Sequence, residues 1–168
     1  MTYLFRRLLI LFVFLCCFPG FASALEIGSE APNFTLKNLD GQEVSLTDFK
    51  GKIIVLKLAT TWCPTCKQQT QEIEAAASTL KSHNAMVVEV FLQDSEAMVK
   101  KFLTEHPLDL DYVALLDDGQ VVKKYNVYLI PRVLILDADL KIRRDGNLMP
   151  ASEITAMVTE LSEKEKKD

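Results

Sequence analysis

The spacing of the apolar positions changes several times along the chain, and each change predicts a new element. Residues 52–60 (KIIVLKLAT) form an apolar, β-branched run that is typical of a strand buried on both faces. Beyond Pro64 and up to about Ser82, apolar side chains recur at the i, i+3, i+4 and i+7 spacing of an amphipathic helix. Those four side chains are Ile73, Ala76, Ala77 and Leu80.

The same criteria assign the rest of the chain. Strands are predicted at residues 85–93 and 110–117, and helices at residues 95–106, 119–127 and 150–165. Two hairpins are predicted as well, a small one that turns at residues 39–42 (LDGQ) and a larger one that joins residues 132–139 to residues 141–148. Because strands alternate with helices before two strands join directly, we expect an α/β fold with a mixed sheet between helical layers.

The N-terminal segment differs from the rest of the chain. Arg6 and Arg7 precede an uninterrupted apolar run of 11 residues, and the tripeptide ASA ends the segment at Ala24. A basic start, an apolar core and a small-x-small end are the features of a secretory signal peptide. We therefore predict a signal peptide at residues 1–24 and an exported domain at residues 25–168. The run is shorter than the roughly 20 residues that span a bilayer, but a retained membrane anchor is the alternative.

Removal of the signal peptide changes both the charge and the cysteine content. It would leave 17 Lys and Arg against 23 Asp and Glu, a net charge of −6, which argues against a general nucleic-acid-binding protein. It would also remove Cys16 and Cys17, so that Cys63 and Cys66 remain as the cysteines of the exported domain. Two thiols separated by two residues are a candidate redox pair.

The local context of the pair indicates its chemistry. Cys63 follows the predicted buried strand and stands at the start of the helix, where Pro64 occupies the first helical position. The unpaired backbone N–H groups and the dipole of the helix favour a thiolate at Cys63. Cys66 lies one turn inward on the same face and can attack a mixed disulfide formed on Cys63. We therefore assign Cys63 as the nucleophile and Cys66 as the resolving thiol.

Two other interpretations of the pair have weaker support. A zinc site needs four ligands, and neither of the two histidines, His83 and His106, stands at motif spacing from a partner. A structural disulfide in so short a loop would add little stability through loop closure. No metal is therefore expected at the pair.

A second candidate element lies downstream, in the segment YLIPRVLILD. Pro131 stands directly before the strand predicted at residues 132–139. A cis Ile130–Pro131 bond opposite the cysteines would present the Ile130 backbone to an extended peptide for β-like pairing. The alternative is an ordinary trans proline at the start of an edge strand.

These motifs together resemble a known family. The segments GSEAPNFTLKNLDGQEVSLTDFKGK, TTWCPTC and YNVYLIPRVLILD make the chain similar to thioredoxin-like thiol-disulfide oxidoreductases of the TlpA/ResA type, which are close to the AhpC/TSA-Redoxin superfamily. The similarity covers nearly all of residues 26–162. It implies a thioredoxin fold with an N-terminal β-hairpin extension and a central helical insertion at residues 92–111.

The resemblance also implies a function for the site. By that match, Cys63 and Cys66 are the redox pair, Trp62 flanks the site, and Pro131 is the cis-proline that faces it. We expect Trp62, Ile130 and Pro131 to contact the substrate. Members typically reduce disulfides of exported proteins in the periplasm or elsewhere outside the cytoplasm, including apocytochrome c before haem attachment. Their electrons usually come from a membrane thiol-disulfide transporter. Thiol exchange itself requires no cofactor.

The family pattern is broken at two positions where a proton-relay carboxylate is expected. Lys57 replaces the buried Asp that many thioredoxin-like proteins carry six residues before the first cysteine, and Gln69 replaces the Glu of ResA-type reductases. A buried lysine is costly unless it is paired. Lys57 therefore either reaches solvent at a sheet edge, acts as a base or stabilises a thiolate. Arg132, directly after Pro131, either adds positive potential near Cys63 or points to solvent.

Two rival functions remain. A peroxiredoxin has Pro seven residues and Thr or Ser three residues before its reactive cysteine; Thr60 matches the second position, but Leu56 occupies the first. A thioredoxin-like accessory module, such as a chaperone or a copper-handling protein, would use the pair for binding, because two nearby thiols can hold Cu(I). The presence of Trp62, Pro64 and Pro131 around the cysteines favours redox exchange.

Overall fold

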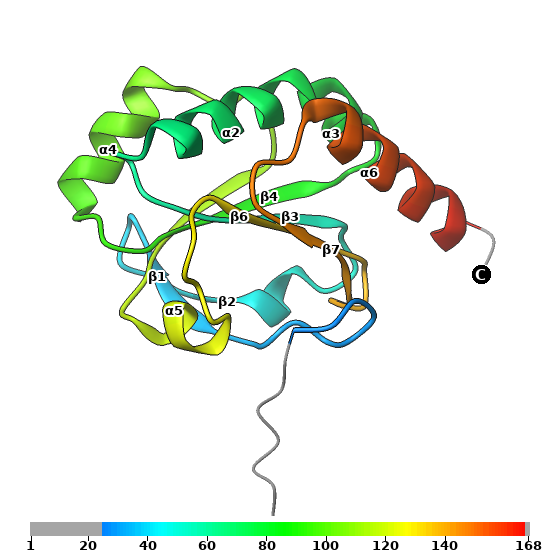
Figure 1. The fold of residues 1–168 in the computed structure, drawn as a ribbon, viewed down its shortest axis with the longest axis horizontal. Coiled ribbons are helices and arrows are strands. Elements are labelled where there is room, and N and C mark those ends of the chain that lie inside the picture. The colour runs from blue at the N-terminus through cyan, green and yellow to red at the C-terminus, as the bar shows by residue number, and fades with distance from the viewer. Residues whose placement is uncertain (1–24, 167–168) are drawn as a thin grey trace, which may run out of the picture.

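A seven-stranded sheet and the helices around it make up residues 25–166, the part of the chain that the computed structural model describes (Figure 1). The strands are β1 (Thr35–Asn38), β2 (Glu43–Ser45), β3 (Ile54–Ala59), β4 (Met86–Phe91), β5 (Tyr112–Leu116), β6 (Arg132–Leu136) and β7 (Ile142–Gly146). The helices are the 3-10 helix η1 (Leu46–Phe49) and the α-helices α2 (Pro64–Ala75), α3 (Ala77–Ser82), α4 (Glu96–Glu105), α5 (Gln120–Lys124) and α6 (Ala151–Glu165). None of these helices is long and apolar enough to cross a membrane. The predicted signal peptide, residues 1–24, lies outside the described residues.

The sheet is mixed, as the sequence predicts. Its strand order is β2-β1-β5-β4-β3-β6-β7. β4 runs parallel to both of its neighbours, β3 and β5, whereas every other neighbouring pair is antiparallel. β3 therefore lies inside the sheet, and its C-terminal end leads into the segment that carries the two cysteines.

Helical layers cover both faces of the sheet (Figure 1). α2, α3 and α6 lie on one face, where Ile73, Leu80 and Val158 pack against the strands. α5 and η1 lie on the other face, where Leu46 and Tyr125 join a second apolar core. Because both faces are covered, the central strands are made almost entirely of apolar residues.

The central strands β3 and β4 are buried at every position, and each contains one charged residue. The charged residues are Lys57 in β3 and Glu89 in β4, and they are direct partners in the parallel register. Side chains two positions apart point to the same face of a strand. Lys57 therefore shares the α2 face with Val55, and Glu89 shares it with Val87.

The helix that the sequence predicts from residue 64 to about residue 82 is divided into α2 and α3. Ala76 lies between them, with φ −87° and ψ −3°. Neither proline nor glycine marks the break, and Ile73, Ala76 and Leu80 all stay buried. The prediction of one continuous helix is therefore wrong. The apolar spacing shows only which side chains face the core, and the break at Ala76 leaves that buried face unchanged, so the sequence pattern could not reveal it.

The predicted insertion, residues 92–111, contains α4 as expected. The chain then enters β5, which pairs with β4 on one side and with β1 on the other. β1 and β2 form the small hairpin predicted near the N-terminus. This hairpin therefore joins the main sheet through β5.

Candidate active site

The two cysteines lie at the junction between β3 and α2, as the sequence predicts. Cys63 is the N-cap of α2, with φ −82° and ψ 121°, and Pro64 follows at the start of the helix. The Cys63 Sγ atom lies 3.2 Å from the backbone N of Cys66 and 3.2 Å from the Oγ1 atom of Thr65. Both cysteines are free thiols. Hydrogen-bond donors therefore surround the sulfur that caps the helix.

Those donors determine the acidity of Cys63. Burial alone would raise the pKa of its thiol, but hydrogen bonds from the side chains and backbone of Cys66 and Thr65 outweigh it and lower the pKa below its ordinary value. The unpaired N–H groups and the dipole of α2 act in the same direction. Cys63 is therefore the thiol of the pair that ionises first.

Cys66 has the opposite property. Its side chain is buried, and that burial, together with the hydrogen bond to Cys63, raises the pKa of Cys66 to about 12. The Thr60 backbone and the Lys57 ammonium act against this rise without cancelling it. Two thiols one helical turn apart therefore differ widely in acidity.

Replacing Thr65 by alanine is expected to move the pH midpoint for alkylation of Cys63 to higher pH. The Thr65 hydroxyl stabilises the Cys63 thiolate, so its loss raises the pKa of that thiol. The measurement is the rate of iodoacetamide labelling at Cys63 as a function of pH, read by mass spectrometry. Thr79→Ala in α3 is the matched control, and an unshifted midpoint in Thr65→Ala would contradict the role given to Thr65.

The segment before β6 faces the cysteines. The Ile130–Pro131 peptide bond is cis, so the trans alternative is wrong. Ile130 packs against the apolar cluster that contains Cys63 and Cys66, and Pro131 is buried. Within residues 25–166 the backbone of Ile130 makes no hydrogen bond. A free stretch of backbone therefore lies beside the thiols.

Large apolar side chains surround this site and are open to solvent. Trp62 is 57% exposed, Tyr128 is 89% exposed and Leu129 is 67% exposed. We call these three residues the apolar rim. A small pocket adjoins the rim, and Tyr128, Ile130 and the buried Thr60 are among the residues that line it. The surface around Cys63 is therefore suited to contact with another polypeptide.

Lys57 does not reach solvent, so the expectation of an edge position is wrong. Its side chain is 1% exposed, because β3 lies between β4 and β6. The Lys57 Nζ atom lies 2.7 Å from Glu89 Oε1 and donates a hydrogen bond of 2.6 Å to Thr70 Oγ1. These partners reduce the cost of burying the ammonium.

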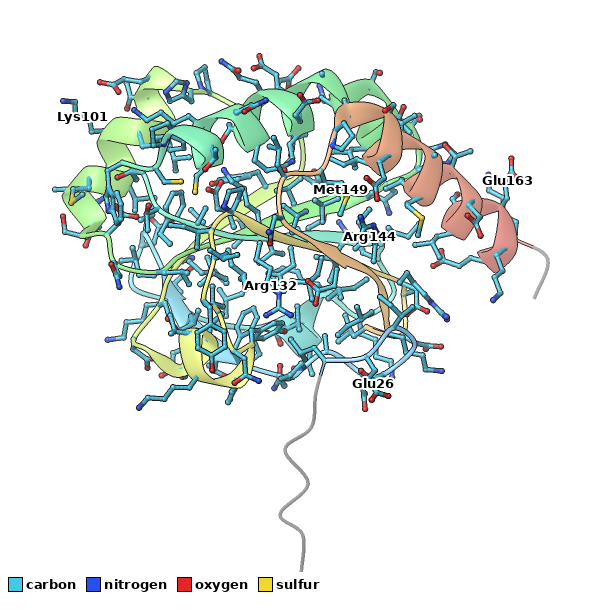
Figure 2. The ribbon with its side chains drawn as sticks, in the orientation of Figure 1. Glu26, Lys101, Arg132, Arg144, Met149 and Glu163 are labelled. Carbon is cyan, nitrogen blue, oxygen red and sulfur yellow. The ribbon has the colours of Figure 1, made fainter. Side chains whose placement is uncertain are left out.

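Arg132 follows Pro131 but is directed away from the thiols. Its guanidinium pairs with Asp145 of β7, with 2.5 Å between Nη2 and Oδ2, and donates a hydrogen bond to the Tyr125 carbonyl. Figure 2 shows the Arg132 side chain on the α5 side of the sheet. Arg132 thus links β6 to β7 and to the end of α5, and the structure does not bring it to Cys63.

Gln69, which replaces the glutamate of ResA-type reductases, joins two parts of the fold. Its side chain is fully buried. Its Nε2 donates to the Met149 carbonyl at 2.9 Å, and its Oε1 accepts from the Met149 N–H at 2.6 Å. A carboxylate cannot donate to that carbonyl. The amide at this position therefore fastens α2 to the loop that precedes α6.

Three residues that were not among the predicted site residues belong to the hydrogen-bonded group around the Lys57–Glu89 pair. They are Glu89, Thr70 and Tyr112. The Tyr112 hydroxyl donates to Glu89 Oε2 at 2.9 Å, and the Thr70 hydroxyl donates to the Cys66 carbonyl at 3.2 Å. The sequence does contain a signal for Glu89, because it is a single charge in an apolar strand, just as Lys57 is.

The described residues offer little to a metal ion. No group of three or more His, Cys, Asp and Glu side chains within residues 25–166 is arranged to hold one. His83 lies at the end of α3, and His106 lies at the end of α4 against Phe102. Cys63 and Cys66 would therefore have to hold a soft metal such as Cu(I) without further ligands of these types.

The chain is similar to known proteins in sequence and in fold. A model of the AhpC/TSA family matches residues 27–145. The chain belongs to the AhpC/TSA family. One similar protein is the thiol-disulfide oxidoreductase ResA of Bacillus subtilis (strain 168). It is 31% identical to this chain over 148 residues, which cover 83% of this chain and 82% of that protein.

Further relatives agree with this membership of the AhpC/TSA family. ResA of Bacillus thuringiensis subsp. konkukian is 30% identical over 118 residues, which cover 70% of this chain and 68% of that protein. The crystal structure of a putative thiol:disulfide interchange protein DsbE from Chlorobium tepidum has a TM-score of 0.71 and 25% identity, with 83% of this chain and 99% of that chain covered. The chain is therefore a thioredoxin-like thiol-disulfide oxidoreductase, and the predicted family, fold and enzyme class are confirmed.

Proposed function

We propose that the chain reduces disulfide bonds of proteins outside the cytoplasm through dithiol exchange at Cys63 and Cys66. The observation that supports this most directly is the position of the two thiols, since Cys63 caps the start of α2 with its Sγ atom 3.2 Å from the backbone N of Cys66. The acidities of the two thiols agree with this arrangement. The pKa of Cys63 is lowered by its hydrogen bonds, and the pKa of Cys66 is raised by burial. Both cysteines are buried, Cys63 to 6% exposure and Cys66 to 1%. A more acidic thiol at the helix start, followed by a less acidic and more deeply buried second thiol, suits a nucleophile and a resolving cysteine.

The exchange proceeds in two steps. The Cys63 thiolate attacks one sulfur of the substrate protein, here called the client, and the client's other sulfur leaves as a thiolate that takes a proton from water. Cys66 then loses its proton and attacks the Cys63 sulfur, which breaks the bond between Cys63 and the client. The second client thiolate takes up a proton as it leaves. Two electrons have then passed to the client, and the protein holds a Cys63–Cys66 disulfide.

The apolar rim supplies a docking surface for the client. Trp62 stands directly before Cys63, and Tyr128 and Leu129 stand directly before Ile130. An extended client segment that pairs with the free backbone of Ile130 would place its cysteine beside Cys63 and its neighbouring side chains on the rim. Substrate contact by Trp62 and Ile130 is thus part of the proposal.

Replacing Tyr128 and Leu129 together by serine is expected to raise KM for a protein client by about tenfold or more, because one buried apolar side chain contributes roughly 1.5–3 kcal/mol. The reaction with a small aromatic disulfide should be unchanged. Insulin reduction and DTNB reduction provide the two measurements. Ile27→Ser is the matched control, since Ile27 is 62% exposed on the N-terminal segment. Equal losses with both substrates would contradict a docking role.

The proposed place of action is the bacterial envelope. The N-terminal segment supports export, because Arg6 and Arg7 precede an apolar run with a small-x-small end. The clients would be disulfide-containing exported proteins, of which apocytochrome c is one candidate. A membrane thiol-disulfide transporter would return the pair to the dithiol form.

The equilibrium reduction potential of the pair tests the direction of the reaction. The mature protein is equilibrated with glutathione or dithiothreitol buffers, and the oxidised and reduced forms are counted by mass spectrometry. A potential near that of thioredoxin, roughly −270 mV, or lower would support a reductase. A potential near roughly −120 mV would indicate an oxidant. A pair that does not cycle and instead holds copper tightly would favour the accessory module.

A further inference from the structure

The buried charge of Lys57 lies against the α2 residue that follows Cys66 by one turn. Lys57 donates a hydrogen bond of 2.6 Å to Thr70 Oγ1, and the Thr70 hydroxyl donates to the Cys66 carbonyl at 3.2 Å. Thr70 stands one helical turn after Cys66 on the same side of α2. The Thr70 hydroxyl therefore connects the ammonium of β3 to the resolving cysteine.

The positive member of the pair is the one that contacts α2. Glu89 lies on the next strand, with Oε1 at 2.7 Å from the Lys57 ammonium and Oε2 at 2.9 Å from the Tyr112 hydroxyl. Both oxygens of Glu89 are thus engaged by Lys57 and Tyr112. The Lys57 and Glu89 side chains are each 1% exposed, so water screens their charges weakly.

The other elements packed around Lys57 are mostly apolar. On β6, the register partner of Lys57 is Val133. On α4, the Phe102 ring lies 5.9 Å from Nζ, and the ring of His106 stacks on Phe102 with 4.8 Å between centroids. His106 is therefore separated from the ammonium by an aromatic ring. Tyr112 on β5 faces Glu89 rather than Lys57.

The surroundings of Cys66 change when a client is attached to Cys63. Before attachment, Cys63 helps to raise the pKa of Cys66, whereas Lys57 acts against that rise. Once Cys63 is bonded to a client sulfur, it can no longer carry a negative charge. The Lys57 ammonium then remains as the charged side chain that favours ionisation of Cys66.

We propose that Lys57 is a positioning residue for ring closure, in which its ammonium stabilises the Cys66 thiolate and Glu89 moderates that effect without accepting the proton. The inference rests on the dithiol exchange proposed above. The Cys66 thiolate forms a bond to the Cys63 sulfur, and the bond from Cys63 to the client breaks. Cys66 gives its proton to water, and the departing client thiolate takes a proton from water. Lys57 and Glu89 keep their charges throughout.

Substitution of the two charges should shift the pH midpoint of ring closure in opposite directions. In Lys57→Met the thiolate loses its stabilising charge, so the midpoint rises by about one pH unit, a shift typical of one nearby opposite charge. In Glu89→Gln the buried ammonium has no carboxylate partner, and the Cys66 thiolate becomes its counter-charge. The midpoint then falls by about one pH unit.

DTNB separates ring closure from the first attack. One thionitrobenzoate is released when Cys63 reacts, and a second is released when Cys66 closes the ring. The second phase is followed by stopped-flow absorbance over a range of pH, and it gives the midpoint. The full-length protein and each variant carry Cys16→Ser and Cys17→Ser, so that the thiols that react are those of Cys63 and Cys66. Lys100→Met is the matched control, since it removes an ammonium that is exposed on α4 and paired with Glu96.

The outcomes are distinct for each role. Opposite shifts with an unshifted control support the proposal. A rise in the midpoint of Glu89→Gln, or loss of its second phase, would identify Glu89 as the base and would overturn the proposal. Equal or absent shifts in both variants would indicate that the pair is only structural and would also overturn the proposal. If Lys57→Met does not fold, the direction of the midpoint shift in Glu89→Gln alone tests the proposal. Wild-type protein that never releases the second thionitrobenzoate would refute the proposed exchange itself.

Discussion

Replacing Cys63 by serine is expected to reduce disulfide exchange to the uncatalysed rate, while replacing Cys66 by serine is expected to leave one covalent reaction and no turnover. A serine hydroxyl at position 63 cannot form a mixed disulfide. A serine at position 66 leaves the Cys63 nucleophile intact but removes the thiol that breaks the bond to the client. The two variants should therefore lose activity in different ways: Cys63→Ser should not react with the client at all, and Cys66→Ser should react once and stop.

Trapping experiments distinguish the two losses. Cys66→Ser protein is incubated with insulin or with an extract of envelope proteins and is separated by non-reducing electrophoresis, where the adduct should appear and should vanish on reduction. Cys63→Ser protein is the control and should give no adduct. Turnover by Cys63→Ser, or adducts formed through Cys66, would contradict the assigned order of attack.

Removing one member of the Lys57–Glu89 pair is expected to have the largest effect on stability. Glu89→Leu leaves a buried ammonium without its counter-charge, which typically costs about 3–5 kcal/mol. Replacing both members, as Lys57→Met with Glu89→Leu, should recover most of that loss, because apolar residues of similar volume suit a buried site. Each side chain of the pair is 1% exposed, so solvent screens the unpaired charge weakly and the loss of stability is not reduced.

Urea unfolding of the reduced protein, followed by circular dichroism, measures these free energies. The single and double variants are compared in one cycle, which isolates the coupling between the two side chains. Lys100→Met should unfold at the wild-type urea concentration, because that lysine is exposed. A Glu89→Leu variant as stable as the wild type would show that the buried pair is not required for the fold.

Most elements of the fold follow from local patterns in the sequence. The apolar runs that become β3 and β4 and the helix predicted at residues 95–106 are properties of neighbouring residues, and the structure confirms them. The position of Cys63 at the start of α2 is equally local. Such features depend on a few consecutive side chains and on standard backbone geometry.

The environment of Lys57 could not be predicted in the same way. Its partner Glu89 comes from another strand, and their contact depends on strand order and parallel register. Gln69 and Arg132 show the same limit, since their partners, Met149 and Asp145, belong to distant parts of the chain. A family pattern records that a carboxylate is missing at one position, but it does not record that a neighbouring strand carries one.

The pairing of β1 with β5 has a consequence for how the protein acquires its structure. Lys37 pairs with Leu116, and a bridge joins Glu30 to Lys141, so the first described residues complete their contacts only with much later parts of the chain. Contacts between residues so far apart in sequence slow folding. During synthesis, the N-terminal hairpin can pair with the main sheet only after β5 has been made. A chain with this order of assembly remains unfolded for longer, and the export proposed above would require such a delay, because translocation would precede folding.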